Sequence, residues 1–93
     1  MITLEGKIGI AAKLIRKSME LKESGGHDVF IEWFPHVDWM TIRAFIGPWS
    51  QTKTVKEFTL KFNYVSSVQE TYKEIMEYLD NMGKTSETEA QNG

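Results

Sequence analysis

The spacing of apolar residues changes twice along this chain, and these changes divide it into five elements. Over residues 4–23, apolar side chains recur every three or four positions, which is the period of an amphipathic helix. Between residues 28 and 64, three segments are rich in β-branched and aromatic residues, as β-strands are. The helical period returns over residues 68–82. The predicted order of elements is therefore α-β-β-β-α.

The predicted first helix is apolar over an unusually wide arc, because a second apolar stripe lies about 100° away from the first on its surface. The first stripe consists of Leu4, Ile8, Ala11, Ala12, Ile15 and Met19, and the second of Ile10, Leu14 and Leu21. Thr3 is expected to cap this helix, and Ser24-Gly25-Gly26 to end it. A helix with two such stripes is either deeply buried or contacts a partner as well as its own sheet.

The three predicted strands cover residues 28–34, 37–46 and 54–64, and a tight turn at Pro35-His36 joins the first two. In this hairpin Phe34 would pair with Val37. Alternation then directs one set of side chains toward the helices: Val29, Ile31, Trp33, Met40, Ile42, Ala44, Ile46 and the aromatic residues of the third strand. The opposite face would contain Phe30, Glu32, Trp39, Thr41, Arg43, Phe45, Glu57, Thr59 and Lys61.

The same register places Asp28 opposite Arg43, as a cross-strand ion pair. A slip of one residue would exchange the two faces of the sheet. Aromatic rings stay on the open face in either register, because Phe30 and Trp33 cannot share a face.

The second helix is predicted from the capping-box pattern at residues 67–70, and Gly83 is expected to end it. Its core stripe would consist of Val68, Tyr72, Ile75, Met76, Leu79 and Met82. Residues 84–93 are polar and are predicted to form a disordered tail. We therefore expect one α+β domain over residues 1–83, with two layers, in which both helices cover one face of a three-stranded antiparallel meander.

The charge and composition of the chain exclude several functions. The formal net charge is −2, with five basic and three acidic side chains in residues 1–23 and two basic and six acidic ones in residues 66–93. A nucleic-acid-binding protein normally has a clear basic excess, which this chain lacks. Cysteine is absent, so disulfides and thiolate chemistry are excluded. With no apolar run near the ~20 residues of a membrane span, and no signal-peptide pattern, a cytoplasmic location is expected.

Catalytic motifs are missing from the sequence, since it contains neither a nucleophile elbow nor a phosphate-binding loop. His27, His36 and Asp38 are the candidates for a metal site or an acid–base pair. In an antiparallel hairpin, His27 would lie at the far end from His36. We therefore interpret these as surface residues of turns, and we expect no enzymatic activity, no metal and no cofactor.

The open face of the sheet is the first candidate binding site. Its partner-binding residues would be Phe30, Trp39, Arg43, Phe45 and Trp49. Trp and Arg are enriched at the energetic centres of protein interfaces. The partner could be a second copy, a different protein, or the bases of a nucleotide or single strand, in which case Arg43 or Lys61 would meet phosphate.

The second candidate site is the exposed side of the second helix. Its acidic residues are Glu70, Glu74, Glu77 and Asp80. They form either a solvated helix face or an acidic contact surface for a basic partner.

The order of elements, with Pro35-His36 at the first hairpin, resembles that of the double-stranded-RNA-binding domain over residues 4–82. Members of that family begin their second helix with lysines that grip phosphates. This chain has Ser66-Ser67-Val68-Gln69-Glu70 there, so the resemblance does not imply RNA binding.

In size, acidity and exposed aromatic hairpin, the chain also resembles small phage and prophage proteins, including anti-CRISPR inhibitors built from three strands with flanking helices. That resemblance implies an inhibitor that occupies a host protein's surface, sometimes by imitating the charge of DNA. The acidic residues named above would serve that imitation here.

We therefore expect a small non-enzymatic binding protein, a phage or mobile-element accessory or inhibitor protein that acts through protein–protein contact and forms a homodimer. The alternative is a nucleotide-binding or single-stranded nucleic-acid-binding module that uses the same aromatic face.

Overall fold

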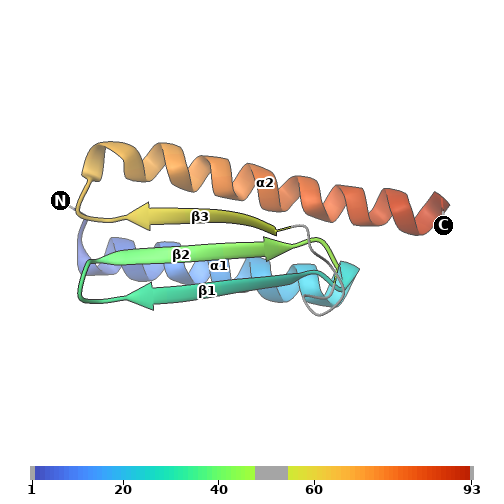
Figure 1. Cartoon of the computed structure of the whole chain (residues 1–93), viewed down its shortest axis with the longest axis horizontal. Helices are drawn as coiled ribbons and strands as arrows, with labels where there is room; N and C mark the ends of the chain where they lie inside the picture. The colour runs from blue at the N-terminus through green and yellow to red at the C-terminus, as the bar shows by residue number, and fades with distance from the viewer. Residues whose placement is uncertain (1, 48–54, 93) are drawn as a thin grey trace.

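The computed structural model describes residues 2–47 and 55–92, with side chains as far as Lys84. Helix α1 spans Leu4–Gly25, and strands β1 (Asp28–Phe34), β2 (Trp39–Phe45) and β3 (Val55–Lys61) follow it. Helix α2 spans Val65–Asn92 (Figure 1). The elements are those that the hydrophobic period predicts, in the predicted order.

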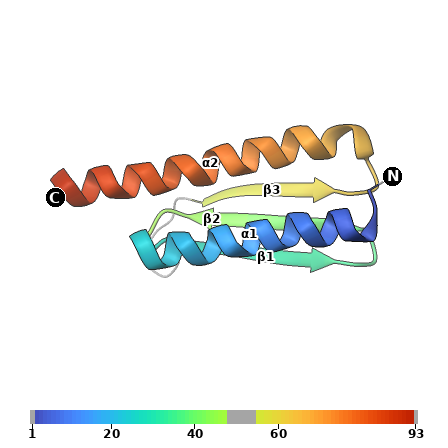
Figure 2. The same ribbon diagram turned by 180° about the vertical axis from the view of Figure 1, so that it is seen from behind.

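The three strands form one antiparallel sheet in the order β1-β2-β3, so β2 is central and β1 and β3 are its edges. Both helices pack on the same face of this sheet (Figures 1 and 2), with α1 along β1 and α2 along β3. The predicted two-layer α+β fold is confirmed.

The core lies between the sheet and the two helices. Its centre is β2, where Ile42 and Ala44 are fully buried, and Leu60 of β3, opposite Met40, is fully buried as well. The helices contribute Leu14 and Leu21 from α1, and Val68, Ile75, Leu79 and Met82 from α2. Burying a side chain of this size contributes about 1.5–3 kcal/mol, so this layer holds the two helices against the sheet.

The β1–β2 hairpin has a longer turn than the sequence predicts. Phe34 pairs with Trp39 rather than with Val37, which leaves residues 35–38 in the turn. The Val37 N–H donates to the Phe34 carbonyl at 3.3 Å, and Asp38 has a left-handed φ of 62°. Aspartate tolerates that conformation better than most residues. The predicted two-residue turn is wrong because Asp38 adopts the left-handed conformation and the turn extends over residues 35–38.

The register consequently differs from the predicted one by two residues, which leaves every side chain on its predicted face because the side-chain period of a strand is two. The cross-strand neighbours do change. Asp28 lies opposite Phe45, and its carboxylate binds the Lys22 ammonium at 2.9 Å. The predicted Asp28–Arg43 ion pair is therefore wrong.

Helix α1 begins and ends as predicted. The Thr3 hydroxyl accepts a hydrogen bond from the Gly6 N–H at 3.0 Å, which satisfies one of the free donors of the first turn. At the other end Gly26 has a φ of 70°, and its N–H donates to the Lys22 carbonyl at 3.0 Å. This is the left-handed cap for which glycine is favoured.

Helix α2 differs from its prediction at both ends. It begins at Val65, and the Ser67 hydroxyl donates to the Tyr64 carbonyl at 3.0 Å instead of capping Glu70. The capping box is wrong because β3 ends early, at Lys61, and the turn after it starts the helix.

At its other end α2 continues through Gly83 to Asn92, so the predicted end at Gly83 is wrong. Gly83 does not have a left-handed φ and lies beside Leu21 of α1. Gly83 is therefore not the C-cap of α2. The disorder predicted for residues 84–93 stays a prediction.

Candidate functional site

Among residues 2–47 and 55–92, no element covers the open face of the sheet, because both helices pack on the opposite face (Figures 1 and 2). The described residues of the predicted site, Phe30, Trp39, Arg43 and Phe45, all lie on this face, as their register positions require. Phe30 is 40% exposed, and the other three are half-buried. Trp49, the fifth predicted residue, lies outside the described residues.

Arg43 lies at the middle of the open face, where it joins all three strands. Its Nη2 is 3.0 Å from Glu32 Oε1 on β1, and its Nε donates to Glu57 Oε2 on β3 at 3.1 Å. Two charge-assisted contacts fix the guanidinium plane and balance its charge locally. The centre of this face is therefore polar and ordered.

The aromatic rings lie toward the two ends of the open face. The Phe30 and Phe45 rings make an edge-to-face contact with centroids 5.5 Å apart. At the other end the Trp39 indole N–H donates to Asn63 Oδ1 at 3.1 Å, and the Lys61 ammonium lies 4.6 Å from the ring centroid. These contacts hold the rings in one arrangement, which lowers the ordering cost of binding.

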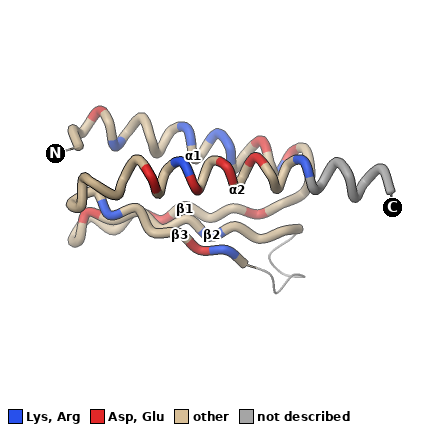
Figure 3. Tube along the Cα trace, turned by 90° about the horizontal axis from the view of Figure 1, so that it is seen from above, with Lys and Arg blue, Asp and Glu red and all other residues tan. Residues whose placement is uncertain are grey.

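The acidic surface of α2 is only partly as predicted. Glu70, Glu74 and Glu77 are exposed, whereas Asp80 forms an ion pair with Lys17 of α1. Figure 3 marks acidic residues along α2 and basic residues along α1. Burial raises the pKa of the Tyr72 phenol, which lies on the same helix, above its ordinary value. The charge of α2 is thus used in part to hold the two helices together.

His27, His36 and Asp38 do not converge. His27 is buried beside the end of β2, where its Nδ1 accepts a hydrogen bond from the Gly47 N–H at 2.8 Å. His36 is exposed in the turn at the opposite end of the hairpin, and Asp38 binds the Lys7 ammonium at 2.7 Å. Among residues 2–47 and 55–84, no three His, Asp or Glu side chains are grouped so that they could hold a metal ion.

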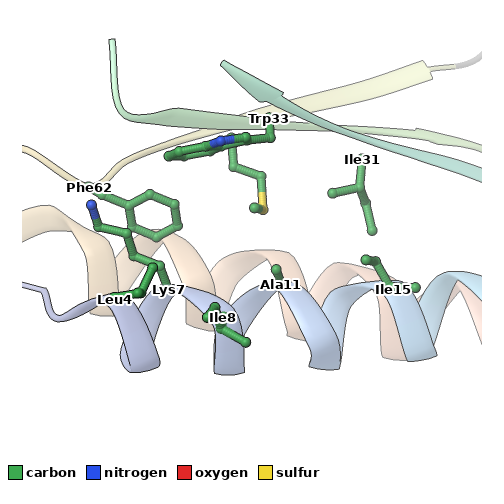
Figure 4. A pocket seen from close by; sticks show the side chains of 9 residues that line it. Leu4, Lys7, Ile8, Ala11, Ile15, Ile31, Trp33 and Phe62 are labelled. Carbon is green, nitrogen blue, oxygen red and sulfur yellow. The ribbon is translucent and has the colours of Figure 1, made fainter. Parts of the chain in front are cut away.

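The structure contains a groove between α1 and β1 that the sequence does not predict (Figure 4). It has a volume of about 370 Å³. Its walls are Leu4, Lys7, Ile8, Ala11 and Ile15 of α1, Ile31 and Trp33 of β1, Met40 of β2, and Phe62. Trp33 lies on the predicted helix-facing side, yet it is 46% exposed because α1 does not cover the outer side of this edge strand.

The two apolar stripes of α1 were the signal for this groove. The second stripe faces the core, since Leu14 and Leu21 are buried and Ile10 packs against them. The first stripe lies outside: Leu4 is 69%, Ile8 52%, Ile15 44% and Met19 64% exposed. The sequence indicated contact with a partner as one of two alternatives, and the structure shows that the first stripe is the one left exposed.

The outer edge of β1 borders the same groove. The Ser18 hydroxyl of α1 donates to the Val29 carbonyl at 2.8 Å, so this carbonyl points away from β2. In an antiparallel strand, alternate residues direct both backbone groups to the same side, so the backbone groups of Ile31 and Trp33 point outward as well. In the described part of the chain no strand lies beside this edge.

Comparison of the chain with protein-family models, with curated proteins and with solved structures found no match in any of the three. Neither helix, within the residues described, has an apolar stretch of the length needed to cross a membrane.

Proposed function

We propose that this protein is a small non-enzymatic binding protein, an accessory or inhibitor protein of a phage or other mobile element, which engages a protein partner through the open face of its sheet. The observation behind this proposal is the uncovered face itself, with Arg43 at its centre and Phe30, Phe45 and Trp39 toward its ends. Trp and Arg are enriched among the few residues that supply most of the binding energy in protein interfaces. The phage or mobile-element origin rests on the resemblance in size, acidity and exposed aromatic hairpin.

The geometry favours a protein over a nucleotide as the partner. Of the two cations that could meet phosphate, Arg43 already binds the carboxylates of Glu32 and Glu57, and the Lys61 ammonium lies over the Trp39 and Tyr64 rings. Base stacking needs an open ring face, whereas the Lys61 ammonium lies over the Trp39 ring. A protein surface can use the same group as it stands, by packing on the rings and hydrogen-bonding around Arg43.

Affinity capture from a lysate of the source cells tests this proposal. We expect the immobilised wild-type protein to retain a partner, and Trp39→Ala to weaken that contact by about 2 kcal/mol, roughly 30-fold, if Trp39 is an energetic centre. Lys73→Ala, an exposed position on α2, is the matched control and should retain the partner. Circular dichroism shows that each variant is folded.

Two results would contradict the proposal. One is capture that is equal for wild type and Trp39→Ala. The other is quenching of tryptophan fluorescence by nucleotides or oligonucleotides that weakens as salt is raised, because this salt dependence is the mark of phosphate binding. That second result would assign the face to the alternative function.

A further inference from the structure

A row of large apolar side chains on α1 is left in water along the same side of the molecule as the outer edge of β1. Leu4, Ile8, Ile15 and Met19 are all more than 40% exposed, and Trp33 of β1 stands beside them. An exposed apolar stripe and an uncovered strand edge are each costly for an isolated domain. Here they are adjacent, so one partner can cover both.

We propose that this partner is a second copy of the chain. The β1 strands of two copies pair antiparallel about a twofold axis at Ile31, and the two α1 helices pack antiparallel across the same axis. The sheet of the dimer then has six strands with the four helices on one face. This surface is distinct from the open face of the proposed function, so either proposal can fail without the other.

The strand pairing follows from the direction of the backbone groups. Val29, Ile31 and Trp33 point theirs outward, and Ile31 is the central residue of β1. With Ile31 opposite Ile31 of the second copy, Val29 lies opposite Trp33 of the second copy. Every outward donor and acceptor then finds its counterpart, as the self-complementary contact of a twofold dimer requires. The Val29 carbonyl keeps its bond from Ser18, since a carbonyl oxygen has two lone pairs.

The apolar stripe of α1 is symmetric about its midpoint, which lies between Ala11 and Ala12. Leu4 and Met19 are equally far from that point, and so are Ile8 and Ile15. Antiparallel packing therefore places Leu4 opposite Met19 of the second copy, and Ile8 opposite Ile15. The two small alanines meet at the centre, where the helices can approach closely.

The lateral position of α1 on the sheet is compatible with contact in both layers. Figures 1 and 2 show α1 over the gap between β1 and β2 rather than beyond the sheet edge. Strands are spaced about 4.8 Å apart, so a twofold axis half a spacing outside β1 separates the two α1 axes by about 10 Å. That is the upper end of the 8–10 Å range of packed helices.

The charges beside the stripe fit this pairing. Arg16 is 81% exposed in its side chain, with its Nε 3.4 Å from Glu20 Oε2 of the same helix, and Glu5 is exposed on the same flank of α1. In the antiparallel register Arg16 lies opposite position 7 of the second copy, which is two residues, or about 3 Å, from Glu5 along the helix. Each dimer thus contains two Glu5–Arg16 pairs between copies.

Analytical ultracentrifugation of the full chain over a range of concentrations tests the dimer. We expect a mass of twice 10.7 kDa for the wild type. Ile8→Glu, at a position that is 52% exposed in one copy, should raise the dissociation constant by at least about 100-fold, because it introduces a charge into each of the two Ile8–Ile15 contacts between copies. Asn81→Glu, an exposed position on α2, adds the same charge and should leave the dimer unchanged.

A charge exchange tests the helix register. Glu5→Arg should weaken the dimer by about tenfold, since it opposes two like charges at each pair, and the double variant with Arg16→Glu should restore the wild-type dissociation constant. A double variant as weak as the single one would overturn the antiparallel α1 register.

Amide hydrogen exchange by NMR tests the strand pairing. The N–H groups of Ile31 and Trp33 should be protected in the wild type and exchange rapidly in Ile8→Glu. A wild-type monomer at all concentrations, or a dimer that Ile8→Glu leaves intact, would overturn the proposal. A third result would also overturn the proposal: a wild-type monomer in which these amides are protected only when an unrelated extended peptide is added. That result would assign the edge of β1 to a different partner.

Discussion

Replacing Gly83 with alanine should stabilise the fold by about 1 kcal/mol, because Gly83 lies inside α2 and not at its end. A glycine in a helix interior costs about 0.8–1.0 kcal/mol relative to alanine, mainly through the backbone entropy that the unfolded chain loses. The added methyl group fits. A Cβ built on Gly83 lies 3.5 Å from Leu21 Cδ2 of α1, which is an ordinary van der Waals distance.

The matched control is Gly26→Ala, at the end of the neighbouring helix. Gly26 has a φ of 70°, and an L-residue with a Cβ in that conformation costs about 1–2 kcal/mol. Two glycine-to-alanine changes in one small protein should therefore shift its stability in opposite directions. Because 1 kcal/mol corresponds to about 4–8 °C in a domain of this size, thermal unfolding followed by circular dichroism resolves both shifts. The proteins must be compared at equal concentration, since association raises the apparent Tm.

A loss of stability in Gly83→Ala, similar to that of Gly26→Ala, would refute the reasoning. It would mean that Gly83 adopts the left-handed conformation of a cap in solution. The helix would then end there, as the sequence pattern predicts.

Two further predictions concern groups that the fold buries. His27→Leu should destabilise the fold by about 1–3 kcal/mol in urea unfolding, because the Gly47 N–H loses its acceptor, whereas His36→Leu in the exposed turn should change little. The pKa of Tyr72 is raised, which means that the folded state holds the phenol proton more tightly than the unfolded state does. The contribution of Tyr72 to stability is therefore present below pH 10.0, the ordinary pKa, and is lost as the pH rises above that value. Urea unfolding between about pH 8 and pH 11 should show that decline, and Tyr72→Phe should reduce it; an equal decline in both proteins would assign it to another group.

Hydrophobic period was sufficient to predict the architecture and the faces of the sheet. Phe30 and Trp33 lie on opposite faces as predicted, although the register of the hairpin was wrong by two residues. An error of two residues preserves every face, whereas an error of one would have reversed them all. Which side chains of a strand are buried therefore depends on whether their positions are odd or even along the strand, and composition and alternation predict this well.

Local signals at the ends of elements were less reliable because distant contacts override them. A two-residue turn was expected at Pro35-His36, but the turn extends to Asp38. The Asp38 carboxylate binds the Lys7 ammonium of α1, and the Asp38 carbonyl accepts a hydrogen bond from the Phe62 N–H at 3.0 Å. None of these partners is near Asp38 in the sequence. The same holds for Gly83, whose neighbour Leu21 belongs to the other helix.

Which of the two stripes of α1 is buried depends on α2. A helix over a three-stranded sheet must face both the strands and the second helix, and Lys17 of α1 pairs with Asp80 of α2 on that side. The stripe with Leu14 and Leu21 lies in the core, and the longer stripe faces outward, toward the edge of β1. The wide apolar arc of one helix then corresponds to two separate surfaces, one packed within the chain and one that we propose packs between copies. Because β1 pairing joins two sheets edge to edge, it would also place the Phe30 rings of two copies on one continuous open face, so that dimerisation would enlarge the surface proposed to bind a partner.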